Sequence, residues 1–249
     1  MEKLSVSQEG LKLVASITML LDHIGAVLIY ALYLSALHAE NYVLSNQMAM
    51  LYEPLRIIGR IAFPIYCFLL VEGFHYTRDI KKYFIRLLIG MVLSEIPFDL
   101  ALSGKIDWSS CSVMVTLILG CMMMAGMNSF SGFWKFLAIP PFFGLAELLG
   151  TDYGGKGILI IAMLALTRGL PREKLWRALG FVVCLWFGPG VSIGPLEIPI
   201  ELFGLFALIP LNLYDGTKLT RNKWLQWGFY LFYPVHLLIL WMLKVLLVG

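Results

Sequence analysis

The chain has 249 residues, of which 59% are hydrophobic and 14% are charged, and its formal net charge is +3. Its mean hydropathy is +0.81. Soluble domains carry roughly 25% charged residues, so this composition excludes an ordinary soluble domain. Because the apolar runs recur from end to end, we expect residues 1–249 to form one all-α, polytopic transmembrane helix bundle.

The apolar runs divide into candidate membrane spans, each of which needs about 20 mostly apolar residues, or fewer if it is tilted or broken. We predict nine spans: 13–36, 55–74, 84–102, 112–127, 134–149, 157–167, 176–190, 198–213 and 225–247. The fourth, sixth and seventh are short, so eight spans and a re-entrant segment is the alternative. Asp22 and His23 interrupt the first span, which therefore reads as a retained helix rather than a signal peptide.

The loop charges predict the orientation of the chain. With a cytoplasmic N-terminus, most of the 19 Lys and Arg residues fall in loops on the inside, and only Lys105, Lys156 and Lys244 fall outside. Basic residues concentrate on the cytoplasmic side of membrane proteins, so we expect an N-in, C-out protein of the cytoplasmic membrane. The net positive charge then reflects topology and contact with membrane lipids, and no nucleic-acid partner is expected.

The four cysteines are Cys67, Cys111, Cys121 and Cys184. They show no CxxC spacing and no histidine partners in sequence, whereas a zinc site needs clustered Cys and His ligands. We therefore predict neither a disulfide nor a metal site.

Ionisable side chains at membrane depth are costly and usually face a bundle interior, where they are candidates for function. Asp22 and His23 lie near the middle of the first span, and histidine suits proton transfer near neutral pH. Adjacent helical residues point about 100° apart, so Asp22 is free to serve another partner. The alternative is a polar pair that only fixes helix packing. Further ionisable groups at similar depth are Glu72, Glu95, Asp99, Glu201 and His236.

Arg56 and Arg60 lie one helical turn apart on the same face of the second span. A guanidinium binds carboxylate or phosphate groups well. Arg56 is placed to reach the outer interface, whereas the deeper Arg60 needs an internal partner. The third span offers Glu95 and Asp99, with Pro97 bending the helix between them, so we expect Arg60 to pair with one of these carboxylates, in a structural or a catalytic role.

The cytoplasmic end of the second span carries a polar stripe of Glu72, His75 and Arg78, at three-residue steps. A basic patch overlaps it and consists of Arg78, Lys81, Lys82 and Arg86. The ordinary role of such a patch is topology and contact with anionic lipids. The alternative is a docking surface for the phosphates of a cytoplasmic cofactor.

His236 lies in the middle of the last span, two residues after Pro234. The proline frees the carbonyl of Tyr230 and kinks the helix. A buried histidine beside a kink is suited to line a polar cavity, and the alternative is a histidine bonded to the freed carbonyl.

Motifs in order along residues 11–240 together resemble the TraX family. They are Leu11-Lys12, Asp22-His23-Ile24-Gly25, the run from Arg56 through Arg60 to Phe68, Glu72-Gly73-Phe74 with Thr77-Arg78, Lys82-Tyr83 with Arg86-Leu87, Ser94-Glu95-Ile96-Pro97-Phe98-Asp99-Leu100, Asp152-Tyr153-Gly154 with Gly157, and Phe232-Tyr233-Pro234-Val235-His236-Leu237. The family is named after a conjugative-plasmid protein implicated in N-acetylation of F-type pilin, and it is similar to integral-membrane acyltransferases of the acyltransferase-3 type.

The resemblance implies a membrane acyltransferase that uses acetyl-CoA as the acyl donor. His23 matches the first-span histidine of the acyltransferase-3 type, and Arg56 and Arg60 match its arginine pair, with RxxxR in place of RxxR-like spacing. The family often has a histidine where this chain has Tyr76, so no catalytic role is carried over to His75.

The residue roles that follow are expectations from this resemblance and from the residue chemistry. His23 is the general base, Asp22 or Glu95 tunes it, and His236 is an alternative base or an acceptor-positioning group. Arg60, with Arg56, holds the donor or stabilises developing negative charge. Glu72 and the basic patch form the donor-binding end.

The acceptor stays open among a pilin-like N-terminus, a glycan, a lipid and a small amine. The rival functions are a proton-coupled transporter or channel, and a membrane assembly partner without catalysis.

Overall fold

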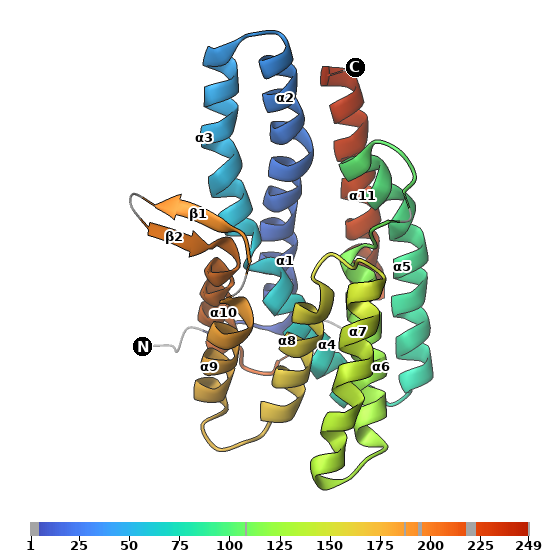
Figure 1. Ribbon diagram of the computed structural model, residues 1–249. Helices are drawn as coiled ribbons and strands as arrows, with labels where there is room; N and C mark the ends of the chain where they lie inside the picture. Colours follow the sequence, from blue (N-terminus) through green and yellow to red (C-terminus); the bar gives the residue numbers. More distant parts are fainter. Residues whose placement is uncertain (1–4, 108, 187, 194–195, 218–222, 249) are drawn as a thin grey trace.

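The computed structural model describes residues 5–107, 109–186, 188–193, 196–217 and 223–248. Most of the described residues are helical, which confirms the predicted all-α class. Figure 1 shows elongated helices that run up and down along one common direction, with α2, α3 and the end of α11 extending beyond the other helices at one end. Three of the basic residues on which the predicted orientation depends lie outside the described residues: Lys3, Lys218 and Arg221.

The N-terminal part is a long helix followed by a helix that returns beside it. The first helix is continuous from α1 (Gln8–His23) through the π-helix η1 (Ile24–Ile29) to α2 (Tyr30–His38). After a tight turn, α3 (Tyr42–Gly59) packs back along α2, and α4 (Ala62–Tyr76) continues toward the opposite end.

The remaining elements complete the bundle around α4. They are α5 (Ile80–Ser103), α6 (Val113–Asn128), the 3₁₀-helix η2 (Gly132–Ala138), α7 (Ile139–Leu148), α8 (Gly154–Thr167), α9 (Glu173–Leu185), the antiparallel strands β1 (Gly190–Ile193) and β2 (Leu196–Pro199), the 3₁₀-helix η3 (Ile200–Ala207), α10 (Leu208–Asn212) and α11 (Lys223–Val248). The last helix, α11, packs along α5 and ends near the turn between α2 and α3 in Figure 1.

Within the described residues, three helical stretches are long and apolar enough to cross a membrane: 8–38, 42–76 and 227–248. Shorter apolar helices cover 113–128, 154–167 and 200–212. Each predicted span overlaps a described helix, but the ends differ, and the spans 176–190 and 198–213 also include residues of β1 and β2.

The second predicted span begins too late in the sequence. Residues 42–54 were expected to form an outer loop, but they are the first turns of α3. The Asn41 side chain caps this helix by accepting the Leu44 backbone N–H at 3.1 Å, and the helix packs against α2. Two helices then replace one span, since the chain breaks at Arg60, whose carbonyl has no N–H partner at Pro64.

The seventh predicted span, 176–190, also ends too late. Helix α9 stops at Leu185, and Gly190 already belongs to strand β1. The β1–β2 hairpin was not predicted, because its residues read as the continuation of apolar runs. It carries the chain from α9 to η3 and projects from the side of the bundle, at the level where α3 is followed by α4 (Figure 1).

The core has two parts. The larger part contains fully buried side chains of α4, α6, α8 and α9, such as Ile65, Met123, Ile158 and Phe181. The smaller part lies between α1, α5 and α11 and includes Tyr233 and Leu237. This smaller cluster surrounds one of the two polar sites described next.

Candidate functional site

The first helix changes its hydrogen-bonding pattern directly after Asp22 and His23. The π-helix η1 begins at Ile24, and such local widening of a helix is frequent at functional sites. The two adjacent side chains face different neighbours: Asp22 contacts residues of α3, and His23 contacts α11. Two polar sites therefore begin at one point of the first helix.

The arginine cluster consists of Asp22, Arg56, Arg60, Tyr153 and Glu201. Asp22 bridges both arginines: Oδ2 accepts from Arg56 Nη1 at 2.6 Å, and Oδ1 accepts from Arg60 Nη2 at 2.7 Å. Arg60 Nη1 donates to Glu201 Oε1 at 3.2 Å, and its guanidinium lies 5.9 Å from the centre of the Tyr153 ring. Two carboxylates thus balance two guanidinium groups.

The expected partners of Arg60 were wrong. Neither Glu95 nor Asp99 pairs with it, because both carboxylates are engaged near the start of α6. Glu95 accepts hydrogen bonds from the backbone N–H and the hydroxyl of Ser112, at 3.1 and 2.5 Å. Asp99 accepts the backbone N–H of Asp107 at 3.0 Å.

The close approach of α1 to the junction of α3 and α4 depends on Gly59. A Cβ atom at this position would overlap the carboxylate and Cβ of Asp22, so only glycine leaves room for the acid between the arginines. Glycine at position 59 is therefore required both for the packing of α1 against α3 and α4 and for the ion pairs of Asp22.

The histidine pair consists of His23 and His236, which are 7% and 5% exposed. His23 Nδ1 lies 2.8 Å from His236 Nε2, and His236 Nδ1 lies 2.6 Å from the carbonyl oxygen of Phe232. A carbonyl can only accept, so His236 Nδ1 carries the proton. With both rings neutral, His236 Nε2 then accepts from His23 Nδ1–H, which leaves the lone pair of His23 on Nε2.

This geometry corrects two sequence expectations. The carbonyl that holds His236 is that of Phe232, four residues earlier, and not the Tyr230 carbonyl that Pro234 frees. The side chain in contact with His23 Nδ1 is His236, whereas Asp22 and Glu95, the expected tuning groups, hydrogen-bond to other residues.

Aromatic side chains enclose the histidine pair. The Tyr233 ring packs edge-on against His23 and His236, with centroid distances of 5.9 and 5.7 Å. The Phe232 ring stacks on His236 at 4.7 Å. The Tyr233 hydroxyl is buried beside Ser112 and the backbone of Val113.

A cavity of about 170 Å³ reaches this aromatic wall. It extends from the start of α1, at Gln8 and Lys12, to Met19 and Tyr233. Other tyrosines, Tyr66 and Tyr83 among them, line it together with apolar side chains. The cavity therefore connects the end of the bundle that carries the N-terminus with the side of the histidine pair.

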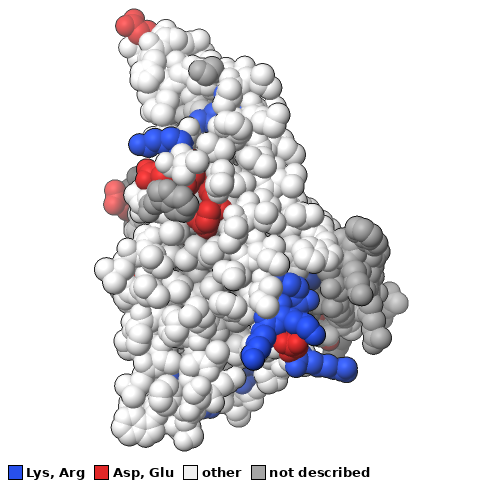
Figure 2. Space-filling view, turned by 90° about the vertical axis from the view of Figure 1, so that its right-hand side faces the viewer, with Lys and Arg blue, Asp and Glu red and all other residues white. Residues whose placement is uncertain are grey.

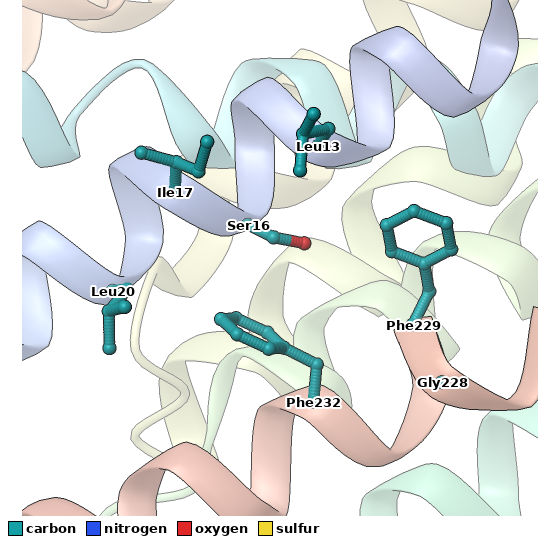
Figure 3. Close-up of a pocket in the computed structure, with 7 residues that line it drawn as sticks. All are labelled: Leu13, Ser16, Ile17, Leu20, Gly228, Phe229 and Phe232. Atoms are coloured by element: carbon teal, nitrogen blue, oxygen red, sulfur yellow. The ribbon is translucent and has the colours of Figure 1, made fainter. Parts of the chain in front are cut away.

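A separate groove of about 210 Å³ lies between α1 and α11. Leu13, Ile17 and Leu20 of α1 line it together with Phe229 and Phe232 of α11, and Figure 3 shows the Ser16 hydroxyl between the two helices. Phe229 lines both the groove and the 170 Å³ cavity. The Phe229 side chain thus lies between the groove and the cavity.

The predicted polar stripe on α4 does not act as one unit. Glu72 is buried and accepts a hydrogen bond from Arg168 Nε at 2.7 Å, and the Arg168 guanidinium lies 5.0 Å from the Tyr76 ring centre. His75 and Arg78 are exposed. Glu72 is therefore separate from the basic patch with which it was grouped.

The basic patch lies on the surface at the start of α5, where Figure 2 shows clustered Lys and Arg side chains around an acidic one. Arg78, Lys81 and Lys82 are exposed, and Asp79 forms a 3.2 Å ion pair with Lys82. Asp79 also caps α5, and the hydrogen bond from the Lys82 backbone N–H lowers the pKa of this carboxyl. Arg86 is half-buried and packs over Tyr83, a cavity-lining residue.

Sequence reasoning did not assign Tyr153, Glu201, Ser112 or Arg168 to a site. Glu201 could be recognised as a candidate because it is an acid inside an apolar run. Tyr153 belongs to a motif of the family resemblance. Nothing in the local sequence links Ser112 to Glu95 or Arg168 to Glu72. Among the described residues, no group of three or more His, Cys, Asp and Glu is arranged to hold a metal ion, and all four cysteines are free.

Comparison with known proteins supplies a family. Residues 7–244 match the model of the family described as TraX protein. The chain is also 31% identical over 252 aligned positions to "Probable fimbrial assembly protein FimC, serogroup H1" from Dichelobacter nodosus, and the alignment covers 95% of each chain. No solved structure matches.

Proposed function

This chain belongs to the TraX family, and from that premise we propose that it is a polytopic integral-membrane acyltransferase. It transfers an acyl group, acetyl in the simplest case, from acetyl-CoA to an amine or hydroxyl acceptor at the membrane or its outer face. The observation that carries the proposal is the hydrogen-bonded chain from Phe232 through His236 to His23, which leaves His23 Nε2 as an unprotonated base.

In the proposed reaction, His23 Nε2 removes the proton of the acceptor as its nitrogen or oxygen attacks the thioester carbonyl. The new C–N or C–O bond forms, the C–S bond breaks, and the CoA thiolate leaves and takes up a proton. A positioned general base contributes about 10²–10⁴-fold to such a step. His236 acts as a positioning group, because it fixes the tautomer of His23 and the direction of its lone pair.

The arginine cluster places two guanidinium groups, each paired with a carboxylate, beside the residue that precedes this base. Arg60, with Arg56, stabilises the negative charge that develops on the thioester oxygen or holds the donor. Asp22 and Glu201 keep both guanidinium groups in place through the ion pairs described above. Glu95 acts at one remove, through Ser112 beside Tyr233.

The donor path in this proposal is the 170 Å³ cavity. Its partly apolar lining suits the pantetheine arm of CoA, and Gln8 and Lys12 line it at the start of α1. The basic patch then receives the phosphates. We place this end in the cytoplasm, with the protein in the cytoplasmic membrane and the C-terminus outside.

Acetyl-CoA binding to the detergent-purified protein, measured by calorimetry, tests the proposal without knowledge of the acceptor. We expect saturable binding that survives His23→Ala but weakens in Arg60→Gln and in Lys81→Gln/Lys82→Gln. Lys105→Gln, an exposed cation at the opposite end, is the matched control. A well-folded protein that binds neither acetyl-CoA nor CoA contradicts the acyltransferase proposal.

A second candidate function is that of a membrane assembly partner without catalysis. The name of the Dichelobacter nodosus relative, a probable fimbrial assembly protein, favours it. It predicts that His23→Gln alters the stability of the protein or the recovery of partners but no chemistry. A transporter is the remaining alternative, and proton-coupled uptake into vesicles would distinguish it.

A further inference from the structure

A third cavity, of about 380 Å³, lies away from both polar sites. It is formed by the ends of α4, α6 and α8 with η2, at the end of the bundle where the basic loops gather. Its polar lining consists of His75, Asn128, Lys135 and Arg168. We call it the Arg168 pocket.

Arg168 is held in a fixed position in this pocket. Its Nε donates to the buried carboxylate of Glu72 at 2.7 Å, and its guanidinium packs over the Tyr76 ring. In the described part of the chain, neither of its Nη groups takes part in an ion pair. A guanidinium that is oriented through Nε presents its outer edge to an anion, which is the geometry of phosphate recognition.

Lys135 adds a second positive charge from a different element. It projects from η2, is exposed, and forms no ion pair with any carboxylate among residues whose side chains are described. Glu72 compensates one of the two cations, so the pocket keeps an excess of positive charge. An anionic ligand would bring both cations into charge-assisted hydrogen bonds.

The rest of the lining is apolar and includes Phe74, Met124 and Met127. A pocket with cations at one side and methionine and aromatic side chains at the other suits a charged group on an apolar or extended chain. It does not suit a free inorganic ion, which would leave most of the volume without a partner.

We propose that the Arg168 pocket binds a phosphate ester carried on a longer chain, held by Arg168 and Lys135. Two sources provide this chemistry: an anionic phospholipid head group and a phosphate-bearing soluble cofactor. The exposed lysines Lys81 and Lys82 of the basic patch do not line this pocket. The cofactor form of the proposal rests on the proposed acyl-CoA donor, whereas the lipid form does not.

The test uses the full-length protein in a zwitterionic detergent with two probes. One probe is phosphatidylglycerol in mixed micelles, with phosphatidylcholine, whose zwitterionic head group has no net charge, as the reference, and the other is coenzyme A. Affinity is measured for the wild type, for Lys135→Gln, and for Lys105→Gln as the matched exposed cation at the other end. Lys135 is the variant of choice because its removal breaks no ion pair among the described side chains.

We expect Lys135→Gln to weaken one probe about tenfold, with Lys105→Gln unchanged; a charge-assisted hydrogen bond of this kind contributes roughly 1.5 kcal/mol. Loss confined to phosphatidylglycerol identifies a lipid head group, and loss confined to coenzyme A identifies a cofactor phosphate. Equal affinities of Lys135→Gln and wild type for both probes overturn the proposal. Glu72→Gln, which releases Arg168 but keeps the side-chain volume, should give the same probe preference.

Discussion

The arginine cluster and the histidine pair begin at adjacent residues, Asp22 and His23, but differ in how completely their polar atoms are paired. In the arginine cluster, two carboxylates face two guanidinium groups, and Arg60 contacts both acids. In the histidine pair, three ring nitrogens take part in hydrogen bonds, and His23 Nε2 has no hydrogen-bond partner among the side chains that the structure describes. The comparison teaches that neighbouring buried polar groups can differ in kind: in one site the charged groups pair with one another, and in the other a ring nitrogen keeps its lone pair.

The largest expected effect is on the rate of acyl transfer, and it comes from a substitution in the histidine pair. His23→Ala should reduce acyl transfer by about 10²–10⁴-fold, since it removes the only ring with a free lone pair in the pair. The variant should remain folded by circular dichroism, and the exposed His38→Ala serves as the control. Transfer at the wild-type rate in His23→Ala would remove the distinction between the sites.

A substitution in the arginine cluster tests its contribution to the stability of the protein. Asp22→Ala should lower the free energy of unfolding by about 3–5 kcal/mol, because it leaves Arg56 without its carboxylate and Arg60 with Glu201 alone. Denaturant unfolding in detergent measures this change, with the exposed Glu53→Gln as the matched acidic control on α3. An unfolding free energy equal to that of Glu53→Gln would show that the cluster does not stabilise the helices.

A smaller effect is expected from a substitution that fills the space beside Asp22 in the arginine cluster. Gly59→Ala should destabilise the protein by about 1–3 kcal/mol, since the new methyl group overlaps Asp22 and must push α1 away. Gly144→Ala in α7 is the control, because no atom lies within 4 Å of the place that its new methyl group would take, and helix propensity favours alanine there. Similar unfolding free energies for the two variants would contradict the close packing at Gly59.

The smallest effect is expected far from both sites, at the basic patch. Lys81→Gln/Lys82→Gln should weaken acetyl-CoA binding only a few-fold at low salt, because exposed charges contribute about 1 kcal/mol or less each. At about 1 M salt the difference from wild type should vanish, since the Debye length falls to roughly 3 Å. Calorimetry at both salt concentrations measures it, and a loss that persists at high salt would place these lysines in direct contact with the donor.

Local sequence predicted most of the helical segments and the ionisable side chains that lie within them. Periodicity placed Arg56 and Arg60 on one face, and the separation of adjacent helical residues predicted that Asp22 would face away from His23. Hydropathy failed to predict a helix where a polar segment is stabilised by packing against a neighbouring helix. Residues 42–54 are too polar to read as a span, yet they form a helix against α2.

The partners of these residues could only come from the tertiary structure. His23 meets a histidine 213 residues away, and Arg60 meets Glu201 at a separation of 141 residues. Helical periodicity fixes the direction in which a side chain points, but not which helix lies in that direction. Glu95 and Asp99 were plausible partners by depth, and the packing of α5 against α6 and α11 turned them elsewhere. Depth along a helix follows from local sequence, whereas the neighbour at that depth depends on how all the helices pack together.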